Sequence, residues 1–398
     1  MKEASEADQE TGLFGKHPAD RGRKRLWIAL PVLLLFALLW FAVPVPVFEV
    51  PYASVVYDRN GELLSARISD DGQWRFPPGD ALPERYLTAL LHFEDKRFMR
   101  HPGIDPLAVG RAVRENFRAR RVVSGGSTIT MQAVRLSEVN PPRTFRRKLL
   151  EAVQALRLES RYTKAEILQM YAAHAPFGGN VVGLQAASWR FFGRDAAELS
   201  WAEAALLAVL PNAPALIHPG RNRDALLRKR NRLLESLHGA GHFDALSLQL
   251  AQAEPLPEAP LPLPQLTPHL LDRIALEGGA GTQQRSTIDA NLQRRAAEVA
   301  AQHHELLRAN EIHNMAVLIA EVNSGRVLAY IGNSPQQAGQ RSRGQAVDII
   351  RAPRSTGSIL KPALYALMLH RGMILPNTLV ADVPTQVAGY SPQNFSRT

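Results

Sequence analysis

The longest uninterrupted apolar run covers residues 26–43, LWIALPVLLLFALLWFAV, and carries no charge. It is just long enough to span a bilayer as a helix, and Pro31 is better tolerated in a membrane helix than in a soluble one. Four basic residues between positions 21 and 25 precede it, which predicts a cytoplasmic N-terminus. We expect a basic cytoplasmic tail over residues 1–25 and one transmembrane anchor over residues 26–46. A cleaved signal peptide is the weaker alternative, because the run is long and PVPVFE is a poor cleavage site.

The pattern after the anchor predicts two domains. Short alternating segments over residues 50–76, with a turn at residues 59–62, indicate strands. Residues 80–240 are rich in helix signals, including Asp105 before a proline and capping boxes that begin at Thr163 and Ser200. Proline-dense residues 253–268 indicate a semi-rigid linker. We therefore expect a mainly helical domain over residues 50–240, a proline-rich linker over 250–285, and a second domain over 286–398.

The second domain also has a clear pattern of its own. A helix is expected around residues 291–309. The apolar segments MAVLIAEV and RVLAYIG flank the turn residues 323–325, and this arrangement predicts a β-hairpin.

Composition narrows the chemistry. The chain has no cysteine, which excludes disulfides, thiolate metal sites and a thiol nucleophile. Its formal net charge is +10, but the basic residues are spread through helices without interleaved aromatic residues or a nucleic-acid motif. We therefore expect no nucleic-acid partner. On a membrane-tethered protein, such a surface suits anionic lipid head groups or a phosphorylated lipid substrate.

An acidic residue continues an apolar helical stripe in the segment 82–105. Leu87, Leu90 and Leu91 recur at helical spacing, and Glu94 is the next position on that stripe. Partial burial there would raise the pKa of the Glu94 carboxyl and suit it to proton transfer near neutral pH. The alternative is a helix-end glutamate that reaches into water. The segment by itself leaves both interpretations open.

Two further segments suit anionic groups. Residues 125–132, GGSTITMQ, combine glycines, hydroxyls and the free amides of a helix start, although a plain helix cap is the more common explanation. Arg147 and Lys148 lie four and three residues before Glu151, so these residues share a helix face. They indicate either a cationic pyrophosphate clamp with a second acid or an exposed salt bridge.

A serine and a lysine one helical turn apart form a candidate nucleophile in the second domain. Ser358 and Lys361 have the SxxK spacing, in which a neutral lysine activates the serine hydroxyl. A bare SxxK also arises often by chance.

Taken together, these segments resemble the peptidoglycan glycosyltransferases of class A penicillin-binding proteins, which are lysozyme-like polymerases of lipid II. Residues 94–103, EDKRFMRHPG, resemble the family's EDxxFxxHxG motif. Residues 126–132 and 147–151 resemble its second and third motifs, and residues 167–187 and 203–214 its fourth and fifth. Arg135 replaces a usual lysine, and Ala173 a usual asparagine. The sequence STGSILKP at residues 355–362 resembles the transpeptidase domain. Together with Met131, this sequence is most similar to the 1C branch of the family.

The resemblance implies a mainly α, lysozyme-like glycosyltransferase domain after one transmembrane helix, followed by the start of an α+β penicillin-binding, serine β-lactamase-like domain. Glu94 would be the general base, and Glu151 would assist the leaving group, directly or through a divalent cation such as Mg²⁺ or Mn²⁺; no metal ligand is firmly assigned. Ser358, with Lys361, would form the acyl-enzyme and react with β-lactams. The substrate-binding residues implied by the motifs are Asp95, Phe98, His101, Gly103, Gly126, Ser127, Thr128, Gln132, Arg135, Arg147 and Lys148.

The resemblance also implies partners and a location. Lipid II, nascent glycan strands and other cell-wall synthesis proteins are the expected partners. The expected location is the bacterial inner membrane, crossed once, with the catalytic body outside the cytoplasm. About forty residues follow Ser358, without Ser-x-Asn or Lys-Thr-Gly, too few to close a transpeptidase domain. We therefore expect an incomplete domain with crippled cross-linking. A non-catalytic scaffold that binds lipid II or glycan, and a peptidoglycan hydrolase, are the alternative functions.

Overall fold

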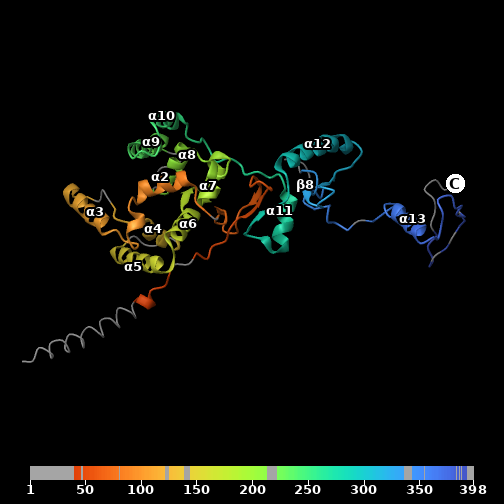
Figure 1. The fold of residues 1–398 in the computed structure, drawn as a ribbon, viewed down its shortest axis with the longest axis horizontal. Helices are drawn as coiled ribbons and strands as arrows, with labels where there is room; N and C mark the ends of the chain where they lie inside the picture. The colour runs from red at the N-terminus through yellow and green to blue at the C-terminus, as the bar shows by residue number, and fades with distance from the viewer. Residues whose placement is uncertain are drawn as a thin grey trace, which may run out of the picture. The chain divides into compact units, whose positions relative to one another are not determined.

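The computed structural model in Figure 1 describes residues 40–45, 48–79, 81–121, 125–138, 144–212, 222–335, 343–353, 355–381, 383–384, 386 and 388–391. Contacts divide the chain into two units, residues 1–350 and residues 351–398. Most of the predicted transmembrane anchor lies outside the described residues. Within the described residues, no helix is both long and apolar enough to cross a membrane.

A compact group of helices forms most of the first unit (Figure 1). Its α-helices are α2 (Glu84–Glu94), α3 (Pro106–Ala119), α4 (Ile129–Leu136), α5 (Phe145–Arg161), α6 (Lys164–His174), α7 (Leu184–Phe192), α8 (Trp201–Val209), α9 (Arg223–Gly239) and α10 (Ala245–Ala253). Short 3₁₀ turns lie at η1 (Phe98–Arg100), η2 (Ala196–Glu198) and η3 (Leu210–Asn212). The prediction of a mainly helical domain is confirmed.

Helix α8 forms the centre of this body. Seven of its nine residues are buried, which is the pattern of a helix enclosed on all sides. It packs against α2 and α9. The end of α2, which carries Glu94, is therefore anchored to the most buried part of the fold.

The helix starts follow the sequence signals. The Asp105 carboxylate accepts hydrogen bonds from the backbone N–H groups of Leu107 and Ala108 at the start of α3. Both predicted capping boxes are present, one beginning at Thr163 and one at Ser200. Each cap satisfies backbone donors that have no partner within their own helix.

A three-stranded sheet joins the segment before the helices to the segment after them. Strands β1 (Ser54–Tyr57) and β2 (Leu63–Arg67) pair antiparallel around the predicted turn, and β6 (Gln283–Arg285) pairs parallel with β1. Val55 and Leu63 enter the main helical core, whereas Val56 and Leu64 enter a second apolar cluster with Ile288. Alternate residues of a strand point to opposite faces, so this sheet separates the two cores.

The predicted linker contains more regular structure than its prolines suggested. Within residues 250–285 the chain forms α11 (Pro268–Ile274), the π-helical turn η4 (Ala275–Gly279) and β6. Proline occupies the first position of α11, where its missing N–H costs nothing. The domain boundaries given above stay predictions.

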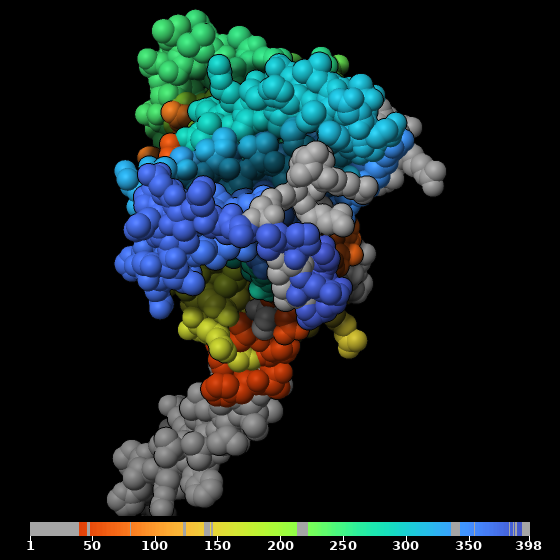
Figure 2. All heavy atoms as spheres, turned by 90° about the vertical axis from the view of Figure 1, so that its right-hand side faces the viewer, coloured from red at the N-terminus to blue at the C-terminus, as the bar shows by residue number. Residues whose placement is uncertain are grey.

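The expected helix and hairpin follow as α12 (Ala290–Arg308), β7 (Val317–Ala320) and β8 (Val327–Ile331), with the two strands antiparallel. Residues of α12 lie on the surface shown in Figure 2. Two small strands, β4 (Pro176–Gly178) and β5 (Val181–Val182), form a second sheet with β3 (Trp74–Arg75). The second unit contains α13 (Lys361–His370), and most of its side chains are exposed.

Candidate active site

Glu94 is the last residue of α2 and is held by two amide groups. Its Oε2 accepts a hydrogen bond from Gln132 Nε2 at 2.7 Å. Its Oε1 lies 3.5 Å from the Nδ2 of Asn212, which is in η3. Burial raises the pKa of the Glu94 carboxyl above its ordinary value, and the two amide hydrogen bonds oppose that rise. The helical stripe thus places a partly desolvated carboxylate at the end of α2, and its role as a base stays a prediction.

Helix α4 connects Glu94 to the second candidate acid, Glu151 of α5. Gln132 and Arg135 lie three residues apart on α4, so they share one face. Gln132 binds Glu94, and Arg135 binds both carboxylate oxygens of Glu151 at 3.1 and 2.8 Å. Glu151 is buried, whereas the Arg135 side chain remains 37% exposed. The guanidinium therefore lies between a buried carboxylate and the solvent.

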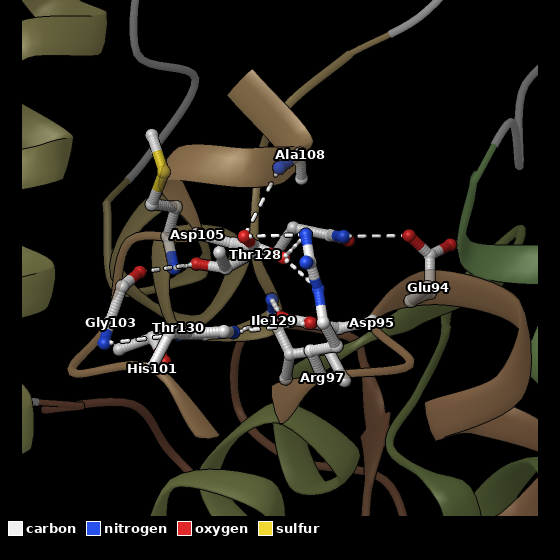
Figure 3. Close-up of polar contacts among 12 residues, drawn as sticks. Glu94, Asp95, Arg97, His101, Gly103, Asp105, Ala108, Thr128, Ile129 and Thr130 are labelled. Carbon is white, nitrogen blue, oxygen red and sulfur yellow. Dashed lines mark hydrogen bonds and ion pairs between the residues drawn. The ribbon is translucent and has the colours of Figure 1, made fainter. Parts of the chain in front are cut away.

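Asp95 ties the segment after α2 to the start of α4 (Figure 3). Its carboxylate accepts from His101 Nε2 at 3.0 and 3.1 Å and from the Ile129 N–H at 3.3 Å. His101 Nδ1 accepts from the Gly103 N–H, so the ring proton donated to Asp95 lies on Nε2. Asp95 and His101 are both buried, and these contacts support a positioning role for them. Their contact with substrate stays a prediction.

Thr128 completes the same connection from the other side. Its hydroxyl donates to the Gly103 carbonyl at 2.6 Å and accepts from the Met131 N–H at the start of α4. Thr128 therefore caps α4 and also binds the 94–103 segment. The interpretation as a helix cap is correct for Thr128, and the contact with Gly103 is an additional one. The buried ring of Phe98 lies beneath Lys164, whose Nζ is 4.2 Å from the ring centroid.

Two of the candidate glycines are required by close packing. Gly103 has a φ of +97°, and a Cβ atom there would lie 2.8 Å from the Ala155 carbonyl oxygen. A Cβ atom on Gly126 would lie 2.9 Å from the Cα of Val109 in α3. Both distances are shorter than real Cβ contacts, so these positions let the segments around the site approach one another.

We expect Gly103→Ala to destabilise the fold on the order of 3 kcal/mol, because left-handed strain and a backbone clash add together. Gly61→Ala is a matched control: Gly61 also has a φ of +97° but has open space around it. Equilibrium unfolding of both variants in denaturant measures the difference. Equal losses would contradict the clash at Gly103.

A cleft opens next to Glu94. Its lining includes Ser127 together with the basic residues Lys96, Arg97 and Arg111. Arg97 makes a bidentate ion pair with Asp105 at 2.8–3.0 Å, so its position is fixed. The lining also holds the carboxylates of Glu94, Asp95 and Asp105, so it contains three acidic side chains and three basic ones. Lys96 and Arg111 are the basic residues of this lining that do not pair with Asp105, and they place positive charge beside the candidate base.

The two basic residues of the segment 147–151 have different surroundings. Arg147 forms an ion pair with Glu138 and is half-buried, whereas Lys148 is exposed on α5. The expected exposed salt bridge to Glu151 is wrong, because Glu151 is buried and binds Arg135. The role of Arg147 and Lys148 as a pyrophosphate clamp stays a prediction.

The acidic residues of this region already have protein partners. Among the described residues, Asp95, His101 and Asp105 form a group whose ligand atoms lie within 4.8 Å of one another. However, Asp95 binds His101, and Asp105 binds Arg97. Both oxygens of Glu151 bind Arg135. A divalent cation would have to displace these partners, so the residues do not fit a resident metal as they stand.

Ser358 and Lys361 lie in the second unit. Lys361 is the first residue of α13, and its backbone N–H donates to the Ser358 carbonyl at 3.1 Å. Both residues are exposed. The SxxK turn is therefore formed, and the role of Ser358 as a nucleophile stays a prediction.

Sequence reasoning missed several residues that support the site. Lys164 donates at 2.7 Å to both the His101 carbonyl and Glu159, yet it was seen only as part of a capping box. Lys229 of α9 donates to Asn212 at 2.8 Å. A lysine in an ordinary basic helix gives no local signal of such a contact, because the contact forms only when α9 lies beside η3.

The model of the transglycosylase family matches residues 60–238, the region that contains Glu94, α4 and Glu151. Residues 60–238 belong to the transglycosylase family. The predicted resemblance is thereby confirmed, and the transglycosylase domain coincides with the helical body and the cleft described above.

Relatives extend the similarity beyond the transglycosylase domain. Penicillin-binding protein 1C of Escherichia coli (strain K12) is 38% identical over 379 residues, which cover 94% of this chain and 48% of the relative. Penicillin-binding protein 1A of Aquifex aeolicus (strain VF5) is 38% identical over 207 residues, covering 52% of this chain and 28% of the relative. The chain thus spans about half the length of the first of these relatives.

A crystal structure of penicillin-binding protein 1A from Haemophilus influenzae is also similar, at 16% sequence identity. The match covers 87% of this chain and 57% of that chain, with a TM-score of 0.30. A score this low carries no argument about the fold.

Proposed function

We propose that the transglycosylase domain polymerises lipid II into peptidoglycan glycan strands, with Glu94 as the general base. The observation that carries this proposal is the Glu94 carboxylate, which is partly desolvated, held by Gln132 and open to a cleft whose lining includes Lys96 and Arg111. Burial raises the pKa of Glu94, and a base is most effective when its pKa approaches the working pH.

The proposed reaction exchanges one C–O bond for another. Glu94 accepts the proton of the acceptor sugar's 4-hydroxyl as that oxygen attacks the anomeric carbon of the growing chain. The bond between the anomeric carbon and the phosphate oxygen breaks, and undecaprenyl pyrophosphate leaves with the bonding electron pair. Cationic side chains near the cleft stabilise the charge that develops on the leaving group.

Glu151 takes part in this scheme through Arg135. Because both carboxylate oxygens bind the guanidinium, Glu151 is not free to transfer a proton directly. It instead holds Arg135, half-exposed, at the side of α4 that also carries Gln132. A bidentate guanidinium suits the oxygens of a pyrophosphate. A divalent cation at Glu151 would have to displace Arg135, and no step of the proposed reaction depends on one.

Incubation of the purified chain with labelled lipid II tests the function. We expect glycan strands of increasing length together with released undecaprenyl pyrophosphate. Binding of lipid II without any product would instead support a non-catalytic scaffold. Release of reducing ends from finished peptidoglycan, without use of lipid II, would support a hydrolase.

The same proposal covers location and the second domain. A site that consumes a lipid-linked substrate suits a protein anchored in the inner membrane by residues 26–46, with cell-wall synthesis proteins as partners. Ser358 and Lys361 would serve cross-linking and β-lactam acylation in a complete transpeptidase domain. These roles rest on the resemblance of residues 355–362 to the transpeptidase domain, and the chain spans only 48% of penicillin-binding protein 1C.

A further inference from the structure

Lys229 is a half-buried cation on α9, outside the segments that resemble the family's motifs. Its Nζ donates to Asn212 Oδ1 at 2.8 Å and to the Val209 carbonyl at 3.3 Å. It also lies 5.1 Å from the ring centroid of Phe93, the residue before Glu94. Three elements, α2, α8 and η3, therefore fix the position of this ammonium group beside the candidate base.

The ammonium group determines which way the Asn212 amide points. Lysine can only donate hydrogen bonds, so the Asn212 oxygen must face Lys229. The amide nitrogen then faces the other way, toward Glu94 Oε1 at 3.5 Å. Without Lys229, the amide could rotate and present its oxygen to the carboxylate, which would repel the charged form of Glu94.

The contact of Lys229 with Asn212 also brings a positive charge close to Glu94, where other groups affect the pKa of the carboxyl. Asp95 follows directly in the chain and raises the pKa of Glu94. Tyr86 of α2 and Tyr171 of α6 are buried nearby as neutral phenols, and Gln132 approaches from α4. Burial lowers the pKa of Lys229, and the nearby Glu94 carboxylate opposes that shift. The positive charge of Lys229 in turn lowers the pKa of Glu94.

We infer that Lys229 is a positioning residue for glycosyl transfer: it orients Asn212 and keeps Glu94 a carboxylate as the pH falls. This inference rests on the proposed function, because it assigns Lys229 a role only if Glu94 is the base. Lys229 acts through Glu94 and Asn212 and touches no reacting atom.

The pH dependence of lipid II polymerisation tests the inference. The base must be ionised, so activity falls as the pH drops through the pKa of Glu94. Loss of a nearby positive charge raises that pKa, and in Lys229→Met we expect the acidic limb of the kcat/KM profile to move up by about 1 pH unit. At pH values below the limb, the activity relative to wild type should fall about tenfold. Lys229→Arg, which retains the charge, should return the limb most of the way.

Two controls make the result specific. Arg228→Met removes one exposed positive charge from the same helix and should leave the limb unchanged. Thermal unfolding of each variant reports damage to the fold, which would lower activity equally at all pH values. A uniform loss in Lys229→Met, or an unmoved acidic limb, would overturn the inference.

Different results would contradict the proposed function and the inference about Lys229. If Glu94→Gln polymerises lipid II normally, the assignment of the base is wrong and the role of Lys229 is lost with it. If Glu94→Gln is inactive and Lys229→Met keeps the wild-type pH profile, the inference alone is wrong.

Discussion

Glu94→Gln is expected to reduce lipid II polymerisation by about 10²-fold or more, the usual contribution of a general base. Glutamine keeps the shape of the side chain, and its amide can still bond Gln132 after rotation, but it cannot accept the proton of the acceptor hydroxyl. The variant should therefore fold normally. Initial rates of strand formation from labelled lipid II, measured at several pH values, check the loss.

Glu84→Gln provides the matched control. Glu84 is exposed in the first turn of the same helix, α2, so the chemical change is identical and only the place differs. We expect wild-type rates from this variant. Polymerisation by Glu94→Gln at rates near those of Glu84→Gln would sink the assignment of the base.

The Arg135–Glu151 pair should show unequal effects when either partner is removed. Arg135→Met leaves the buried Glu151 carboxylate without its cation, and we expect a loss of about 3 kcal/mol in the free energy of unfolding. Glu151→Gln leaves a guanidinium that can reach water, since the Arg135 side chain is 37% exposed, so its loss should be about 1 kcal/mol. Denaturant unfolding measures both values.

The double variant Arg135→Met/Glu151→Gln should be more stable than Arg135→Met alone, because it removes the uncompensated buried charge. Strictly additive losses would contradict a coupled pair. Lipid II polymerisation should fall about 10²-fold in both single variants, since each removes or releases the guanidinium that we propose binds the leaving pyrophosphate. Arg135→Lys keeps the charge but loses the bidentate contact, so it should retain part of the activity.

Local signals in the sequence were sufficient for the helix starts, the two hairpins and the position of Glu94. The caps at Asp105, Thr163 and Ser200 formed as expected because each depends on neighbours within a few residues. The apolar stripe placed Glu94 at the end of its helix for the same reason, and the structure adds that burial raises the pKa of its carboxyl. Such features need no knowledge of the tertiary fold.

Contacts between distant segments were beyond local reasoning. The pairing of Glu151 with Arg135 depends on α4 and α5 packing together, and helical spacing instead suggested a salt bridge within α5. Lys229 shows the same limit, since its contact with Asn212 joins α9 to η3. The proline count of residues 253–268 likewise gave no sign that α11 and β6 follow closely.

The sheet of β2, β1 and β6 determines where this chain can be shortened. A fragment that ends near residue 250 would retain the helices and the cleft but lose β6. Strand β1 would then present an unpaired edge, and Val56 and Leu64 would lose the apolar cluster that covers them. Exposed edges of this kind favour aggregation. A fragment that keeps this sheet paired must therefore include β6, so its boundary is set by strand pairing rather than by the end of the helical body.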